Sequence, residues 1–142
     1  MVPQLSVFLQ NKSGKIATIT RILSEHQIDI RALSIADTAD FGILRMLVSD
    51  IQAAKEILSG LNCILSVNEV VVVAVPDRIG GLAEVLSLIA DAEIDIEYMY
   101  SLIGREDKMA DMIFRVSDEE RFRKVLLAKG LHTITAAQLG LK

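Results

Sequence analysis

Residues 10–30 read QNKSGKIATITRILSEHQIDI, and this stretch decides the fold. An apolar run from Leu5 to Leu9 precedes it, and the polar segment Asn11-Lys12-Ser13-Gly14 follows that run. Apolar residues then recur at helical spacing: Ile16, Ile19 and Leu23. The pattern predicts a strand, a tight turn at the glycine and a helix.

The same pattern recurs 66 positions further along the chain, where Asp77-Arg78-Ile79-Gly80 takes the place of the first turn. The helical stripe recurs as Leu82, Val85 and Ile89. The triplet Ile28-Asp29-Ile30 falls on Ile94-Asp95-Ile96 at the same offset. A triplet, a glycine and a stripe in one register indicate an internal repeat. We therefore predict two modules, residues 1–68 and 69–142.

Each module is expected to run strand, helix, strand, strand, helix, strand. The predicted strands are Leu5–Leu9, Ile28–Ile35, Phe41–Val48, Cys63–Val67, Val70–Val75, Ile94–Leu102, Met109–Val116 and His132–Leu139. The predicted helices are Lys15–His26, Ser49 to about Gly60, Leu82–Ala90 and Glu119–Lys129, with capping boxes at Ser49–Gln52 and Ser117–Glu120. The order predicts an α+β protein of two tandem ferredoxin-like βαββαβ modules, each an antiparallel sheet with its helices on one face.

Composition narrows the function classes. The formal charge of −4 and the pI near 5.1 give no broad attraction to nucleic acids or anionic membranes. Cys63 is the only cysteine, which excludes an intramolecular disulfide and a clustered-thiol metal site. An apolar content of 51% is high for modules of this size, so we expect a homodimer or higher homo-oligomer. We expect a cytoplasmic protein, with no metal and no cofactor.

The turn before the first helix is the candidate ligand site. Free amides at a helix start attract a carboxylate or phosphate, and Gly14 lets a ligand approach the main chain. The amide of Asn11 and the carboxylate of Asp29, at the start of the neighbouring strand, would complete a site for a zwitterion such as an amino acid. The alternative is that Asn11 and Gly14 are turn residues and Asp29 is a solvated strand end.

These residues resemble the ACT domain. The resemblance rests on Asn11-Lys12-Ser13-Gly14-Lys15-Ile16, on Ile28-Asp29-Ile30 and on Asp77-Arg78-Ile79-Gly80-Gly81-Leu82-Ala83-Glu84-Val85, and it covers nearly the whole chain as two copies. It implies a regulatory module that binds a small molecule, commonly an amino acid, at an interface between two ACT units. It also implies ligand contacts from Asn11, from the main chain around Gly14 and from Asp29.

Two departures from the family pattern affect the site. Ser13 and Ile79 stand where proline is common, and Asp77 stands where the first copy has the amide of Asn11. Because Asp77 would repel a ligand carboxylate, we expect the first turn to bind the charged groups and the second copy to supply mainly walls. The predicted ligand-binding residues are Asn11, Lys12, Ser13, Gly14, Lys15, Asp29, Ile30, Asp77, Ile79, Gly80, Gly81 and Asp95.

The favoured interpretation is a non-enzymatic sensor that binds an amino acid and modulates a partner, which would be a separate metabolic enzyme. The alternatives are a structural or assembly subunit without a ligand, an RNA-recognition module and a small enzyme. The RNA-binding alternative lacks a basic surface and an aromatic platform on its strands. The enzyme alternative lacks a plausible set of acid, base and nucleophile.

Overall fold

The computed structural model describes residues 1–10, 13–37, 41–103 and 108–142. They form two compact units, each with its own apolar core. The N-terminal unit contains residues 3–68 and 136–142, and the C-terminal unit contains residues 69–135 with Met1 and Val2. The predicted fold class is confirmed: β-α-β-β-α-β occurs twice, with antiparallel sheets.

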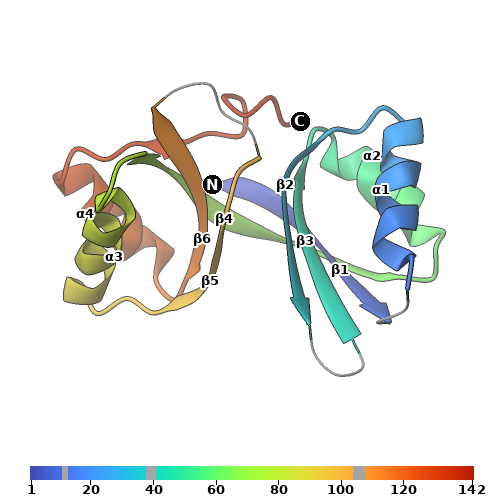
Figure 1. The fold of residues 1–142 in the computed structure, drawn as a ribbon, viewed down its shortest axis with the longest axis horizontal. Helices are drawn as coiled ribbons and strands as arrows, with labels where there is room; N and C mark the ends of the chain where they lie inside the picture. The colour runs from blue at the N-terminus through green and yellow to red at the C-terminus, as the bar shows by residue number, and fades with distance from the viewer. Residues whose placement is uncertain (11–12, 38–40, 104–107) are drawn as a thin grey trace. The chain divides into compact units, whose positions relative to one another are not determined.

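The N-terminal unit has a sheet in the order β2-β3-β1-β4. Its elements are β1 (Val2–Gln10), α1 (Lys15–Glu25), β2 (Ile30–Asp37), β3 (Phe41–Val48), α2 (Ile51–Ser59) and the first part of β4 (Ile64–Pro76). Strand β3 is antiparallel to both β1 and β2. Within this unit, α1 and α2 lie on the same side of the sheet (Figure 1).

The core of the N-terminal unit follows from the two periodicities of its sequence. Alternate residues of β1 point to the helices because strand side chains alternate between faces, and Leu5, Val7 and Leu9 are all buried there. The helical stripe of α1 meets them through Ile19 and Leu23. Helix α1 therefore lies along the sheet with its polar face exposed.

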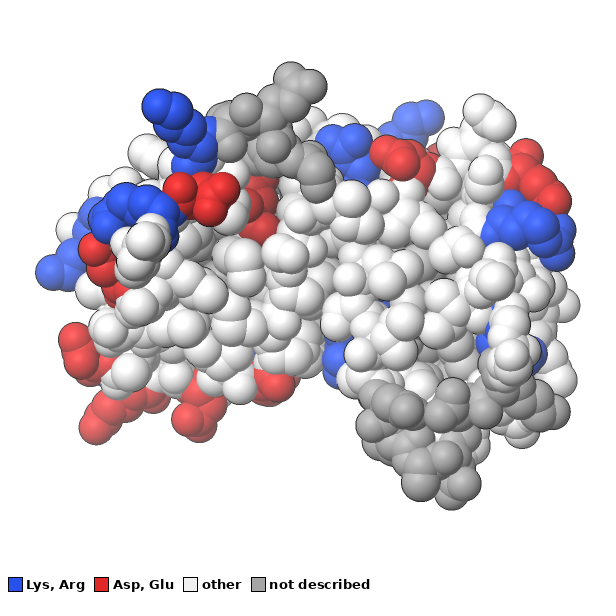
Figure 2. All heavy atoms as spheres, viewed as in Figure 1, with Lys and Arg blue, Asp and Glu red and all other residues white. Residues whose placement is uncertain are grey.

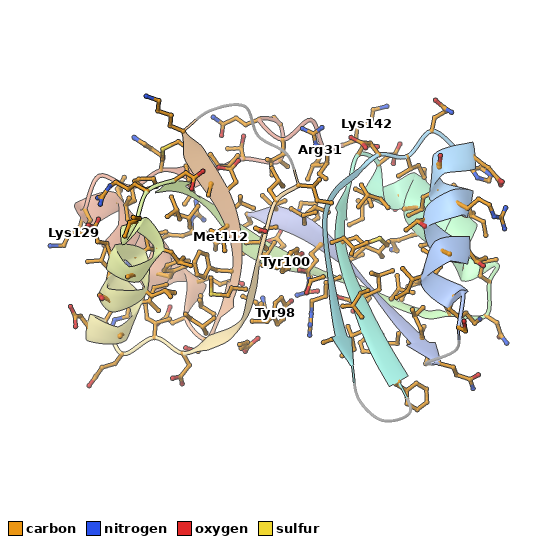
Figure 3. All side chains as sticks on the ribbon, in the orientation of Figure 1. Arg31, Tyr98, Tyr100, Met112, Lys129 and Lys142 are labelled. Atoms are coloured by element: carbon orange, nitrogen blue, oxygen red, sulfur yellow. The ribbon has the colours of Figure 1, made fainter. Side chains whose placement is uncertain are left out.

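The C-terminal unit repeats this arrangement, with β6 and β7 both paired to β4. Its further elements are α3 (Gly81–Asp91), β5 (Ile96–Ser101), β6 (Met109–Val116), α4 (Glu119–Ala128) and β7 (Thr133–Ile134). Phe114 of β6 and Phe122 of α4 pack edge to face in the core, with ring centroids 5.4 Å apart. Tyr98 and Tyr100 of β5 stack with centroids 6.5 Å apart (Figure 3).

The separation of Cys63–Val67 from Val70–Val75 into two strands is wrong, because β4 runs from Ile64 to Pro76 without a break. The polar residue at the predicted break is satisfied within the N-terminal unit. The Oδ1 of Asn68 accepts from Gln4 Nε2 at 3.3 Å and from Ser6 Oγ at 3.5 Å. Gln4 and Ser6 are themselves buried. A polar residue whose hydrogen bonds are made does not need a turn.

The predicted last strand His132–Leu139 is also too long, because β7 covers only Thr133–Ile134. Residues 136–142 instead belong to the N-terminal unit, where Leu139 and Leu141 are buried. The amide of Lys142 donates to Ser49 O at 2.9 Å. The chain turns after β7, since the amides of Leu139 and Leu141 both donate to Ala136 O.

Candidate functional site

The first glycine turn lies between β1 and α1 of the N-terminal unit. Gly14 has φ +83°, a left-handed conformation that glycine adopts at little cost. A Cβ built at Gly14 meets no atom within 4 Å, so the space beside the turn is open. The amide and the hydroxyl of Thr18 both donate to Gly14 O at 3.0 Å, which fixes the first helical turn. The result is an accessible helix start whose first turn is hydrogen-bonded to Gly14 O.

The second glycine turn, between β4 and α3, has the same backbone at its centre. Gly80 has φ +85° and is equally open. The next residue differs, because a Cβ at Gly81 would lie 2.1 Å from Pro76 O. The side chains also differ: Arg78 Nη2 lies 2.8 Å from Glu84 Oε2. This turn is therefore tighter than the first and carries an ion pair.

The four helices in the described part of the chain start in two different ways. Helices α1 and α3 have Gly14 and Gly80 at the cap position, and glycine has no side chain to accept from the first amides. Helices α2 and α4 are capped by Asp50 and Asp118, whose carboxylates accept from the amides of Ala53 and Arg121 at 3.0 Å. The first amides of α1 and α3, the two helices at the predicted site, therefore have no capping carboxylate.

The predicted capping boxes placed the cap one residue too early. Ser49 accepts from the amide of Asp29 at 2.9 Å instead, and its own amide donates to Asp29 O at 2.9 Å. Ser117 makes the same two bonds with Asp95, at 3.1 and 2.9 Å. These serines therefore tie the strand that follows the first helix to the start of the second helix.

Asp29 lies far from the Gly14 turn within its own unit. Gln10, which ends β1, pairs with Phe41, whereas Ile30, which starts β2, pairs with Val48. Seven residues of β3 separate those two positions, which corresponds to about 23 Å. Helix α1 brings the chain back along the sheet, so β2 starts at the opposite end. Within one unit, the structure therefore does not bring Asp29 and the glycine turn together.

Asp29 and Asp95 have exposed side chains. Asp29 Oδ2 forms an ion pair with Arg31 Nη1 at 3.2 Å, and Arg31 lies on β2 (Figure 3). Asp95 repeats the position of Asp29, because Pro76 pairs with Met109 while Ile96 pairs with Val116. Each aspartate thus lies at the end of its sheet opposite the glycine turn of the same unit.

The other predicted site residues are placed as follows. Asn11 and Lys12 lie outside the described residues. Ser13, Asp77 and Ile79 are exposed in their turns, Lys15 starts α1 half-buried, and Ile30 starts β2 half-buried. Leu9, the last residue of the predicted first strand, lies in the core and is 5% exposed.

A hollow that the sequence did not predict lies beside Lys15. It has a volume of about 230 Å³ and is lined by Phe8, Phe41, Cys63 and Ile64, among others. Phe41 and Ile64 are more than half exposed. The sequence contains one indication of this hollow. The chain has only four phenylalanines, and two of them, Phe8 and Phe41, lie on β1 and β3 close to the predicted turn.

Three further properties of the described residues bear on function: metal-binding groups, membrane-spanning helices and surface charge. Among the described residues, no group of three His, Cys, Asp or Glu side chains is arranged to hold a metal ion. None of the helices in the described parts of the chain is long and apolar enough to cross a membrane. On the face drawn in Figure 2, basic and acidic side chains of the described residues lie near one another along the upper part, and acidic side chains alone lie along the lower left edge.

Comparison with known proteins assigns the family. The sequence profile of the ACT domain pair matches residues 1–141. The chain therefore belongs to the ACT domain pair family, as its sequence motifs indicated. No curated protein matches the chain.

Solved structures have the same fold as this chain. The chain is similar to protein BT0572 from Bacteroides thetaiotaomicron, with 36% identity, a TM-score of 0.88 and coverage of 98% of this chain and 95% of that one. It shares its fold with the ligand-free regulatory subunit of aspartate kinase from Thermus thermophilus, with 15% identity, a TM-score of 0.62 and 90% coverage of each chain. Aspartate kinase from Synechocystis is similar over 98% of this chain but 26% of its own length, with 19% identity and a TM-score of 0.58.

Proposed function

We propose that this protein is a non-enzymatic regulator that binds an amino acid at the Gly14 turn and modulates a separate metabolic enzyme. Membership of the ACT domain pair family supports a ligand-binding regulatory role. The geometry of the first turn supports the position of the ligand and the nature of its charged group.

The start of α1 is the observation that carries the proposal. No side chain caps its first amides, the space beside the left-handed Gly14 is open, and its first turn contains no acidic residue. Lys15 adds a positive charge there. A carboxylate is the group that such a helix start attracts, because it meets the positive end of the helix dipole. The first turn of α3 contains Glu84 and follows Asp77, so it is less suited to an anion.

The ammonium group of the ligand requires a carboxylate from elsewhere. Asp29 lies about 23 Å from the turn of its own unit along β3. Our proposal therefore assigns this contact to Asp29 of a second copy of the chain, in a homodimer, which matches the site between ACT units that the family resemblance implies. Sedimentation of the chain with and without the bound amino acid tests the dimer. A monomer that binds the amino acid normally would contradict this part of the proposal.

The hollow beside Lys15 favours an amino acid with an apolar side chain. Phe8, Phe41 and Ile64 offer apolar surface at a short distance along the sheet from the turn. Burial of an apolar group there would add about 25 cal/mol per Å² to the binding energy. The order of affinities we expect is therefore aliphatic or aromatic amino acids first, and acidic ones last.

A thermal-shift screen of the twenty amino acids tests the function. A ligand at 100 times its dissociation constant stabilises the native state by about 2.7 kcal/mol, which a melting curve detects readily. We expect one or a few apolar amino acids to raise the Tm. The absence of a shift with all twenty would favour the structural or assembly subunit.

Matched variants at the two turns test the position. Valine at Gly14 is unsuitable, since a β-branched residue at φ +83° is strained. Asparagine tolerates that conformation and fills the open space. We expect Gly14→Asn to weaken binding at least tenfold by calorimetry, and Gly80→Asn to leave it unchanged. Equal effects of the two variants would place the ligand away from the first turn.

A further inference from the structure

A groove occurs in each unit at corresponding positions, between the outer face of the second helix and the segment that follows it. In the C-terminal unit it has a volume of about 540 Å³ and runs along α4 past Arg123 and Leu127. In the N-terminal unit it has about 390 Å³ and runs along α2 past Lys55 and Ser59. Arg123 stands 68 positions after Lys55, and Leu127 stands 68 after Ser59. The groove is thus duplicated, but its side chains differ.

The acidic side chains of the α4 groove already have cationic partners. Glu119 Oε1 accepts from Arg115 Nη1 at 2.6 Å, and Glu120 Oε1 lies 2.9 Å from Lys124 Nζ. The hydrogen bond to Glu120 raises the pKa of Lys124, so the Lys124 ammonium stays charged at neutral pH.

Arg123 is the exception among the charged residues of the groove. Among the described residues, its guanidinium has no hydrogen bond and no ion pair. The charge that remains available in the groove is therefore positive.

The same groove has an apolar side. The side chain of Leu127 is 78% exposed, and Met1, at 37% exposed, borders the hollow with Leu131. One exposed leucine is ordinary on a protein surface. Here, however, three apolar side chains and an unpaired guanidinium line the same cavity. Together they are complementary to a molecule with an apolar body and one anionic end. At the corresponding positions, the α2 groove has Ser59 and Cys63 in place of Leu127 and Leu131.

We propose that the α4 groove binds a small organic acid with an aliphatic body. The carboxylate would pair with Arg123, whose planar fork suits a bidentate contact, and the body would lie against Leu127 and Leu131. His132 is also in the lining, and its ring carries an N–H donor. The volume lies within the range of small-molecule pockets, about 300–1,000 Å³.

The groove discriminates against amino acids, which separates it from the site at Gly14. An amino acid brings an ammonium group that must be matched by a carboxylate. The carboxylate of Glu119 is held by Arg115 in a half-buried ion pair at 2.6 Å, and Arg123 would repel a second cation. The two sites therefore select for different charges, and the inference does not depend on the proposed function.

Three probes with the same branched body test this inference on the full chain. They are 4-methylpentanoate, L-leucine and 4-methyl-1-pentanol, which present an anion, a zwitterion and a neutral group. Binding is measured from the amide NMR shifts of α4 in ¹⁵N-labelled protein, so leucine bound at the Gly14 turn does not count. We expect 4-methylpentanoate to bind at least tenfold more tightly than the other two.

Matched variants identify the residues. Arg123→Gln should weaken binding of 4-methylpentanoate at least tenfold, whereas Lys55→Gln, at the repeat-related position, should have no effect. Leu127→Ser should weaken binding severalfold. Both Arg123 and Leu127 are exposed, so unchanged melting temperatures are expected. Unperturbed α4 amides at millimolar 4-methylpentanoate, equal binding of leucine, or full binding by the Arg123→Gln variant would overturn the inference.

Discussion

The two turns share a left-handed glycine at the helix start and differ in the charged residues of the helix that follows. Gly14 and Gly80 have φ values of +83° and +85°, and both open onto free space. At the repeat position where the first helix has Thr18, bonded to Gly14 O, the second has Glu84, bonded to Arg78. The comparison shows that duplication preserved the helix start, while the charge next to it diverged. An anion is therefore better suited to the first copy.

Gly81→Ala should have the largest effect on stability and would show how much tighter the second turn is. A Cβ at this position lies 2.1 Å from the carbonyl oxygen of Pro76, so the backbone must move. We expect the free energy of unfolding to fall by about 3 kcal/mol, measured by urea denaturation.

The control is Lys15→Ala, at the corresponding position of the first copy. That position already carries a Cβ, so the change should be within about 0.5 kcal/mol. Similar losses in both variants would mean that the two turns are equally tight.

Gly14→Ala and Gly80→Ala should have the next largest effects, and the two should be equal. Each alanine would take a left-handed conformation, which costs about 1–2 kcal/mol for a residue with a Cβ. Neither Cβ meets another atom within 4 Å, so no clash adds to that cost. Chemical denaturation of both variants measures the difference. A gap well above 0.5 kcal/mol between them would contradict the equivalence of the two backbones.

Asp50→Ala and Asp118→Ala test the contrast between the capped and uncapped helix starts. Each removes a carboxylate that accepts from a helix amide at 3.0 Å, and each should cost about 1 kcal/mol. Asp50→Asn and Asp118→Asn are the controls, because asparagine also caps well. If the alanine variants were as stable as the asparagine variants, these caps would not hold the helix starts.

The sequence predicted the repeat and the element types because both follow from local periodicity. Phe41–Val48 and Met109–Val116 have the bounds that were predicted, since each is an apolar run between turn signals. The sequence did not predict which residue caps α2, because serine and aspartate are both good caps. Only the structure shows that the hydroxyl of Ser49 accepts from the amide of Asp29, which leaves Asp50 as the cap. The fate of residues 136–142 depends on long-range packing, which periodicity does not encode.

The candidate ligand site was also predictable only where it depends on local sequence. The glycine turn at Gly14 is a local feature, and its left-handed conformation and open surroundings agree with the sequence interpretation. The position of Asp29 cannot be predicted from local sequence, because it depends on the end of the sheet to which α1 returns the chain. The hollow at Phe8 and Phe41 depends on strand pairing, with Phe41 opposite Gln10. Nothing in the spacing of these residues indicates that they meet.

The ion pair of Arg78 with Glu84 should have the smallest effect. Its atoms are 2.8 Å apart, but the side chains are 57% and 63% exposed, so solvent screens the attraction. A double-mutant cycle with Arg78→Gln and Glu84→Gln should give a coupling energy of at most about 0.5 kcal/mol. A coupling well above this value would mean that the pair holds the second turn closed. A small coupling leaves Glu84 as a weakly bound negative charge at a helix start, and then Glu84→Thr with Asp77→Asn should make the second turn as receptive to a carboxylate as the first.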